Sequence, residues 1–171
     1  MAGFLNPTET LKKLNLREDM IAADFGCGSG GWVIPLAKIL NKGKVFAIDI
    51  QEEMLSALKS KTEIEKLFNI EFKRANLDQG SGLRENSLDL ILMTNLLFQT
   101  AQRKGILADA KNILKPEGRL LIIDWNKDAK LGPQDERVDS EEIKEMAGSL
   151  DFITEQEFDA SDYHWGLILK K

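Results

Sequence analysis

The stretch that decides the fold is AADFGCGSGG, Ala22 to Gly31, in which four of ten residues are glycine. Gly26, Gly28 and Gly31 satisfy the dinucleotide-binding pattern G-x-G-x-x-G, which is weak evidence when it stands alone. The apolar run 20–25 before the glycines predicts a buried strand, and the residues after them predict a helix. A glycine-rich turn at a helix N-terminus offers free N–H groups to an anionic ligand. The pattern leaves open whether that ligand is NAD, another nucleotide or nothing.

Strands and helices alternate on both sides of this stretch. Apolar runs predict strands at 20–25, 44–50, 70–75, 88–93, 119–124, 152–160 and 163–171. Apolar residues at helical spacing predict helices at 6–14, 31–40, from 52 onward with a break before 63, 106–114 and 140–150. The last two strands leave no room between them for a helix, so they must pair antiparallel. We therefore predict an α/β, doubly wound, Rossmann-like fold: a seven-stranded, mostly parallel sheet with helices on both faces and a C-terminal antiparallel hairpin.

Cap and stop residues sharpen these helix limits. Asn6 and Pro7 suit the N-cap and first position of the first helix. Pro116 and Gly118 act as stop signals for the helix before the fifth strand, and Ser140 suits the cap of the last helix. These residues place the helix ends within a few positions.

The composition excludes several classes of function. A net charge of −5 and a pI of about 5.1 argue against general affinity for nucleic acid. No run approaches the roughly 18 apolar residues of a membrane span, and no secretory signal is visible, so we expect no membrane span and a cytoplasmic protein. One cysteine and one histidine provide neither an internal disulfide nor a zinc site, and we expect no metal.

Two acidic residues narrow the choice of ligand. Asp24, two positions before the first glycine, would face a pyrophosphate unfavourably but suits a ligand with a cationic amine beside its carboxylate. Asp49 ends the second strand 23 residues after Gly26, where a carboxylate accepts hydrogen bonds from ribose hydroxyls. It would repel a 2′-phosphate, so NADP is disfavoured while NAD and an adenosyl group remain. The closing hairpin, which an ordinary dinucleotide-binding domain lacks, argues against NAD.

Five ordered motifs carry a family resemblance over nearly the whole chain. They are AADFGCGSG, VFAIDIQEEML, ANLDQ, NSLDLILMTNLLF and LKPEGRLLIIDW. In these motifs the sequence resembles the class I S-adenosylmethionine-dependent methyltransferases, most closely the small branch related to ubiquinone and menaquinone methyltransferases. GPQDERV and YHWGLILKK also look like the C-terminal parts of that branch. The resemblance implies S-adenosyl-L-methionine as the cofactor.

The resemblance also implies the cofactor-binding residues. Around the methionine part it places Asp24, Gly26, Cys27, Gly28 and Gly30. Around the ribose and the adenine face it places Asp49, Ile50 and Met54. Around the adenine edge and the cofactor's amine it places Asn76, Leu77, Asn95 and Leu96.

Some of these residues have alternative roles that the sequence leaves open. Met54 is equally well explained by core packing, Asn76 by a turn and Asn95 by a helix cap. Asp78 competes with Asn76 for the polar contact at the adenine edge. Cys27 reads as a small side chain in a crowded turn.

Methyl transfer from a sulfonium is an in-line displacement in which the protein mainly positions the nucleophile. We therefore predict a methyltransferase acting on a small-molecule or lipid-like acceptor that the sequence does not identify, with catalytic residues unknown. The alternatives are a NAD-binding oxidoreductase and a non-catalytic S-adenosylmethionine-binding protein. His164 is expected to have a structural or surface role.

The chain is expected to form a single domain over residues 1–171. An N-terminal helix at 1–19 precedes a cofactor-binding core at 20–124, a candidate substrate loop at 125–139, and a last helix with the hairpin at 140–171. Within the loop, the charge run Asp135–Arg137 reads as a solvated face. The core fold leaves no inserted substrate domain, so the sequence leaves open whether a second subunit completes the acceptor site as a homo-oligomer.

Overall fold

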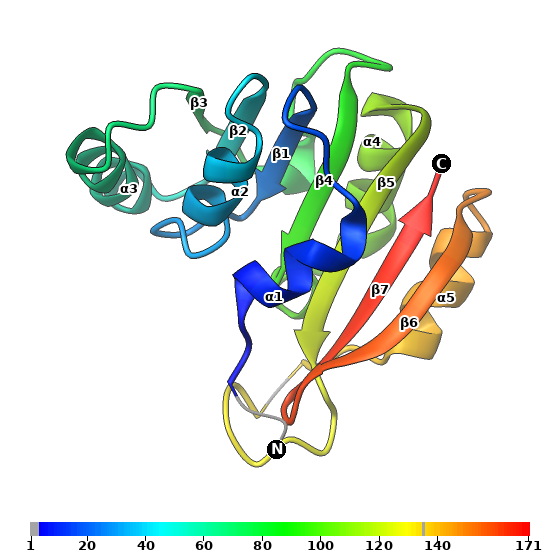
Figure 1. Ribbon diagram of the computed structural model, residues 1–171. Coiled ribbons are helices and arrows are strands. Elements are labelled where there is room, and N and C mark those ends of the chain that lie inside the picture. Colours follow the sequence, from blue (N-terminus) through cyan, green and yellow to red (C-terminus); the bar gives the residue numbers. More distant parts are fainter. Residues whose placement is uncertain (1–3, 135) are drawn as a thin grey trace.

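A computed structural model describes residues 4–134 and 136–171 of the chain (Figure 1). Seven strands form one sheet in the order β3-β2-β1-β4-β5-β7-β6. The strands are β1 (Ile21–Phe25), β2 (Lys44–Asp49), β3 (Ile70–Arg74), β4 (Leu88–Thr94), β5 (Leu114–Trp125), β6 (Ile153–Ser161) and β7 (His164–Lys170). The strands from β3 to β5 pair in parallel, and β7 pairs antiparallel with both β5 and β6. The predicted fold class is confirmed.

Five α-helices and three short 3₁₀ turns connect the strands in the described residues. The helices are α1 (Pro7–Leu11), α2 (Val33–Ile39), α3 (Glu52–Ile64), α4 (Arg103–Ile113) and α5 (Ser140–Gly148). The 3₁₀ turns are η1 (Lys12–Leu14), η2 (Leu77–Gln79) and η3 (Leu97–Gln99). Buried residues of α1, α2 and α3 belong to one apolar core, and those of α4 and α5 belong to a second. The helices thus cover both faces of the sheet, as Figure 1 shows.

The strand β1 lies at the centre of this arrangement. Alternate residues of a strand point to opposite faces, so Ala23 and Phe25 join the core under α4 and α5 while Ala22 joins the core under α1 to α3. Asp24, two residues after Ala22, points to the same face as Ala22, the face covered by α1 to α3. Between β2 and β4, the register pairs Asp24 with Ala47 and Leu92. A carboxylate therefore occupies a central sheet position that apolar residues otherwise fill.

Two predicted element limits are wrong, and both have a local reason. The helix expected to break before Glu63 continues to Ile64, because buried Thr62 donates its hydroxyl to the Lys59 carbonyl at 2.8 Å and packs like an apolar residue. The fifth strand begins at Leu114, so Pro116 and Gly118 lie inside it. Its pairing with β4 shifts register between Leu88 and Leu90, and this irregularity accommodates the extra residues.

The caps agree with the sequence at one helix and differ at another. Asn6 caps α1 by accepting from the Glu9 N–H at 3.2 Å, and Pro7 is the first helical residue, as predicted. At α5 the cap is Asp139 and not Ser140, because the Asp139 carboxylate accepts from the N–H of residue 141. Ser140 instead donates its hydroxyl to a carboxylate on β6.

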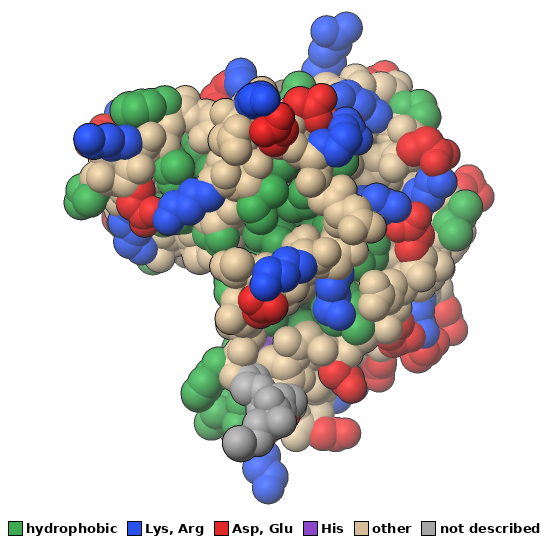
Figure 2. All heavy atoms as spheres, viewed as in Figure 1, with side chains coloured by type: hydrophobic (Ala, Val, Ile, Leu, Met, Phe, Trp, Pro, Cys, Tyr) green, Lys and Arg blue, Asp and Glu red, His purple; other side chains and the backbone are tan. Residues whose placement is uncertain are grey.

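The face of the molecule in Figure 2 carries lysine and arginine side chains interspersed with aspartate and glutamate. It therefore offers no single-sign patch of the kind that binds a polyanion. Across residues 4–134 and 136–171, no helix combines the length and apolar character that crossing a membrane requires.

The glycine-rich turn packs tightly against α3. Gly30 has φ +93°, and a Cβ atom added to it would lie 2.1 Å from Leu58 Cδ1. The neighbouring Gly31 would meet nothing within 4 Å. Gly30 is therefore required by both its backbone conformation and its contact with the buried Leu58 side chain.

We expect Gly30→Ala to lower the free energy of unfolding by about 2 kcal/mol or more, because it combines backbone strain with overpacking. Chemical denaturation measures this difference. Gly31→Ala is the matched control and should stay within about 0.5 kcal/mol of the wild type. Equal stability of the two variants would contradict the packing role of Gly30.

Candidate functional site

A cleft of about 330 Å³ opens where β1, β2 and β3 end, beside the point at which the strand order reverses between β1 and β4. Ligands of doubly wound sheets bind at this position. Its lining comes from the glycine loop, the ends of β2 and β3, and the segment after β4. The lining residues are Gly26, Gly28, Asp49, Ile50, Gln51, Met54, Ala75, Asn76, Leu77, Asp78, Leu96, Gln99, Thr100 and Ile106.

The glycine loop is hydrogen-bonded to the end of β2. The N–H groups of Gly26 and Cys27 both donate to the Ile48 carbonyl, at 2.8 and 2.9 Å. The Asp49 side chain accepts from the Gly28 N–H at 2.8 Å and from the N–H of residue 51 at 2.9 Å. Asp49 is 8% exposed and lines the cleft. It therefore fixes the loop and also forms part of the cleft wall.

Eight of the twelve predicted cofactor residues line this cleft, and four do not. Those in the lining are Gly26, Gly28, Asp49, Ile50, Met54, Asn76, Leu77 and Leu96. Those outside it are Asp24, Cys27, Gly30 and Asn95. Ile50 is 52% exposed and Met54 is 36% exposed, so Met54 is not ordinary core packing. The roles of all twelve toward the cofactor stay predictions.

Asp24 is fully buried, and neither carboxylate oxygen has a hydrogen-bond partner. Burial, with a smaller contribution from the charge of Asp49, raises the pKa of Asp24 to about 8. Unpartnered buried carboxylates are costly unless they stay protonated or meet a cation. This electrostatic state fits the sequence prediction that Asp24 serves a ligand carrying an amine.

Cys27 and Asn95 flank the cleft without lining it. Burial, followed by the charges of Asp24 and Asp49, raises the pKa of the Cys27 thiol, which argues against a reactive thiolate. Asn95 has φ +53°, and its side-chain oxygen is buried without a partner. Its backbone carbonyl accepts from Gln99 Nε2 at 2.6 Å. The carbonyl that the resemblance assigns to the cofactor's amine is thus held by Gln99.

Sequence reasoning missed part of the lining. Gln99 and Thr100 follow β4 at the same sheet edge as the glycine loop, a position that the strand order alone would have identified. Thr100 donates its hydroxyl to Asp78 Oδ1 at 2.5 Å, which joins the segments after β3 and β4 in the cleft wall. Asn76 accepts from the Asp78 N–H at 3.1 Å, which is the turn role that the sequence left open. The other lining residues not predicted are Gln51, Ala75 and Ile106.

The segment after β5 is organised by one guanidinium group. Arg137 donates to five backbone carbonyls, those of Asn126, Lys127, Ala129, Leu131 and Pro133, at 2.5–3.0 Å. The interpretation of this charge run as a solvated face is therefore wrong for Arg137, while Asp135 lies outside the described residues. The proposed substrate loop has a folded core although it lacks regular secondary structure.

His164 and Trp125 pack together at the base of this loop. Their ring centroids lie 4.1 Å apart, and the His164 Nδ1 lies 2.9 Å from the Ser161 hydroxyl. Burial, with a smaller contribution from Arg137, lowers the pKa of His164 to about 4, so the ring is neutral at pH 7. The side chain is buried, which fits a structural role and excludes a surface one.

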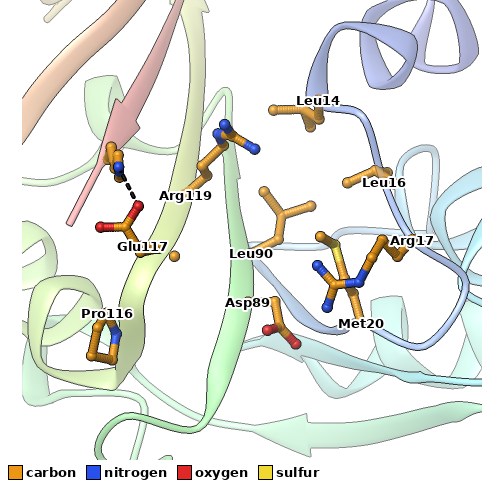
Figure 3. A pocket seen from close by; sticks show the side chains of 11 residues that line it. Leu14, Leu16, Arg17, Met20, Asp89, Leu90, Pro116, Glu117 and Arg119 are labelled. Atoms are coloured by element: carbon orange, nitrogen blue, oxygen red, sulfur yellow. Dashed lines mark ion pairs between the residues drawn. The ribbon is translucent and has the colours of Figure 1, made fainter.

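A second cleft of about 320 Å³ lies where β1, β4 and β5 begin, remote from the glycine loop (Figure 3). Every charged side chain in its lining already has an ion-pair partner. The pairs are Lys170–Glu117, Arg119–Glu155, Lys115–Asp89 and Arg17–Asp19. This balance, together with the position at the amino ends of the strands, favours the first cleft as the functional site.

The family follows from residues 22–118, which match the model described as "Methyltransferase domain". The chain belongs to the methyltransferase family. The matched range contains the glycine loop, Asp49 and every residue of the candidate cleft.

Related proteins and solved structures show which methyltransferases this chain is similar to. It is 27% identical over 125 residues to the demethylmenaquinone methyltransferase of Oceanobacillus iheyensis, covering 72% of this chain and 52% of that protein. The chain thus spans about half the length of the relatives of this kind that it matches. A SAM dependent methyltransferase from Aquifex aeolicus has TM-score 0.89 and 28% identity, covering 97% of this chain and 89% of that one. A putative type 11 methyltransferase from Sulfolobus solfataricus has TM-score 0.76 and 28% identity, with coverages of 99% and 94%.

These likenesses confirm the predicted family and S-adenosylmethionine as its cofactor. They do not favour the NAD-binding oxidoreductase. The match to G-x-G-x-x-G was the misleading part of the glycine stretch, whereas the two acidic residues that the pattern ignores indicated the right class of ligand.

We expect Asp49→Ala to weaken binding of S-adenosylhomocysteine. A hydrogen bond to a charged group is worth about 1.5–3 kcal/mol, so the affinity should fall by roughly 10- to 100-fold in calorimetry. Glu53→Ala, an exposed carboxylate in the first turn of α3, is the control and should leave the affinity unchanged. An unchanged affinity for Asp49→Ala would remove Asp49 from the cofactor site.

We expect the empty protein to lose stability as the pH rises from about 4 to about 8. The folded protein keeps a proton on Asp24 up to a pKa of about 8, whereas the unfolded chain releases it near 3.8, so the folded state binds more protons across this range. Denaturation at a series of pH values measures the slope. Asp24→Asn should flatten it, and so should saturating S-adenosylhomocysteine if its amine neutralises the carboxylate. A slope that both leave intact would contradict this assignment.

Proposed function

We propose that this methyltransferase transfers a methyl group from S-adenosylmethionine to a small, lipophilic, quinol-like acceptor. The observation that carries the proposal is the similarity to demethylmenaquinone methyltransferases over 72% of the chain. The cleft at the switch point supports the donor half of the reaction, since its lining includes Asp49 and the glycine loop.

When bound, the cofactor supplies an electrophilic methyl group that an electron-rich carbon, oxygen or nitrogen attacks in line with the sulfonium. The residues of this chain would hold the cofactor in place for the transfer. Asp49 would hold the ribose, Leu77 and Met54 would contact the adenine, and Asp24 would balance the amine. The glycine loop would receive the carboxylate on its N–H groups.

The acceptor half of the site would lie between Leu96 and the loop that follows β5. Trp125 begins this loop and packs on His164, while Gly132 lies so close to it that an added Cβ would approach the indole ring to 2.4 Å. Arg137 fixes the loop backbone through its five carbonyl contacts. In the proposed site, the Trp125 indole would be the surface on which a planar acceptor ring stacks.

Several features of this proposal remain predictions. The assignment of residues 125–139 as a substrate loop rests on the sequence and on the position of these residues after β5. A second subunit would complete the acceptor side of the open site, and a cytoplasmic location would follow the composition. We also propose that the protein does not act on nucleic acid.

A transfer assay with isotopically labelled S-adenosylmethionine tests the acceptor. We expect label in a short-chain quinol and none in the same ring as its oxidised quinone, because oxidation removes electron density from the ring carbons. Phenols, amines and proteins complete the panel.

The other outcomes separate the alternatives. Label in amines or phenols but not in quinols would overturn the acceptor class while keeping methyl transfer. Tight binding of S-adenosylhomocysteine with no product across the panel would favour a non-catalytic binding protein.

A further inference from the structure

Asp124, near the end of β5, is a fully buried carboxylate outside the cleft lining. Its Oδ2 atom accepts from the backbone N–H groups of Leu97 and Phe98, at 3.0 and 3.2 Å. Its Oδ1 atom accepts from the N–H of Trp125 at 2.8 Å. The side chain therefore ties the segment after β4 to the start of the loop after β5.

Arg103, the first residue of α4, acts on the same segment from the other side. Its Nε atom donates to the Leu97 carbonyl at 2.8 Å. Both backbone polar groups of the buried Leu97 are thus held by charged side chains of opposite sign. The same guanidinium donates to the Glu136 carbonyl at 3.3 Å and lies 3.7 Å from the Glu142 carboxylate. Arg103 consequently contacts the loop after β5 and helix α5 as well.

The segment held in this way forms one wall of the cleft. Leu96, Gln99 and Thr100 all line it, and each lies within three residues of Leu97. Leu96 also stands over the glycine loop, because a Cβ added to Gly26 would lie 3.0 Å from Leu96 Cδ1. A shift of the Leu97 backbone would therefore displace these lining residues relative to the position expected for the cofactor.

We propose that Asp124 and Arg103 are positioning residues. They hold the cleft wall at residues 96–100 and the loop after β5 in a fixed position relative to each other. This inference rests on the proposed function for the acceptor half and deepens it. Neither residue touches the cofactor position. They act through the Leu97 backbone on one side and through residues 125 and 136 on the other.

The charge state of Asp124 gives the proposal a distinctive readout. Burial raises the pKa of Asp124 to about 6, against the lowering effect of its three N–H donors and of Arg103. Below this pH the protonated carboxyl is a weaker acceptor, so affinity for S-adenosylhomocysteine should fall as the pH drops through about 6. Arg103 is the charged side chain that acts on this carboxylate. His164, with a pKa of about 4, titrates below this window. Asp24, whose pKa of about 8 would fall when the cofactor's amine binds, changes the affinity between pH 4 and 8 in the wild type and the variants alike, so the effect of Asp124 is the difference between their pH profiles.

Calorimetry with S-adenosylhomocysteine tests the inference in the intact chain. We expect Asp124→Asn to lower the affinity about tenfold at pH 7.5 and to remove the step near pH 6. Arg119→Gln, which breaks the ion pair of Arg119 with Glu155 in the middle of β5, is the matched control and should preserve both. Wild-type affinity and an unchanged pH profile in Asp124→Asn would overturn the positioning role.

Arg103→Gln is the second variant, and it keeps the test decisive if Asp124→Asn does not fold. Removal of the cation should raise the midpoint of the pH step above that of the wild type, because Arg103 lowers the pKa of Asp124. In the transfer assay, the same variant should have a higher KM for the acceptor and a lower affinity for the cofactor. An unchanged midpoint would overturn the inference. Failure of the wild type itself to bind S-adenosylhomocysteine would instead refute the cofactor site.

Discussion

The contact between the glycine loop and the end of β2 is the constraint on which the site depends. One backbone carbonyl, that of Ile48, accepts two N–H groups of the loop, and the adjacent Asp49 carboxylate accepts a third from Gly28. The loop therefore cannot adopt its shape without β2 in place, and the direction of Asp49 cannot be set without the loop. Two strands that are separate in sequence thereby form one continuous edge of the cleft.

The fold could be predicted from the sequence because its signals are local and repeated. Apolar runs, glycine turns and helical periodicity specified seven strands and their connections, and the short link before His164 specified the antiparallel closure. One error, the start of β5, lies at a register shift, and the others lie where one polar side chain takes a place expected for a different residue. Thr62 packs as an apolar residue, and Asp139 caps α5 in place of Ser140. Such substitutions depend on tertiary neighbours that periodicity does not encode.

The site was predicted less completely than the fold. Residues that follow the ends of β1 and β2 were identified, since motif spacing places them at one sheet edge. Gln99 and Thr100 were missed although they follow β4 at the same sheet edge, because no motif extends to them, and the contact of the 3₁₀ turn there with Asp124 comes from a distant part of the sequence. Arg137 was misread for a similar reason, because its acceptors are backbone carbonyls and leave no trace in residue types. Long-range contacts to the main chain are the part of a site that single-sequence reasoning cannot supply.

The five carbonyl contacts of Arg137 have a consequence for which substitutions the loop after β5 tolerates. They involve only the backbone of the loop after β5, so they do not depend on the exposed side chains of the loop, whereas Gly132 is restricted by its contact with Trp125. Exposed side chains of the loop can then be replaced without loss of these five hydrogen bonds. Arg137 thus makes the backbone course of the loop independent of the side chains at its surface.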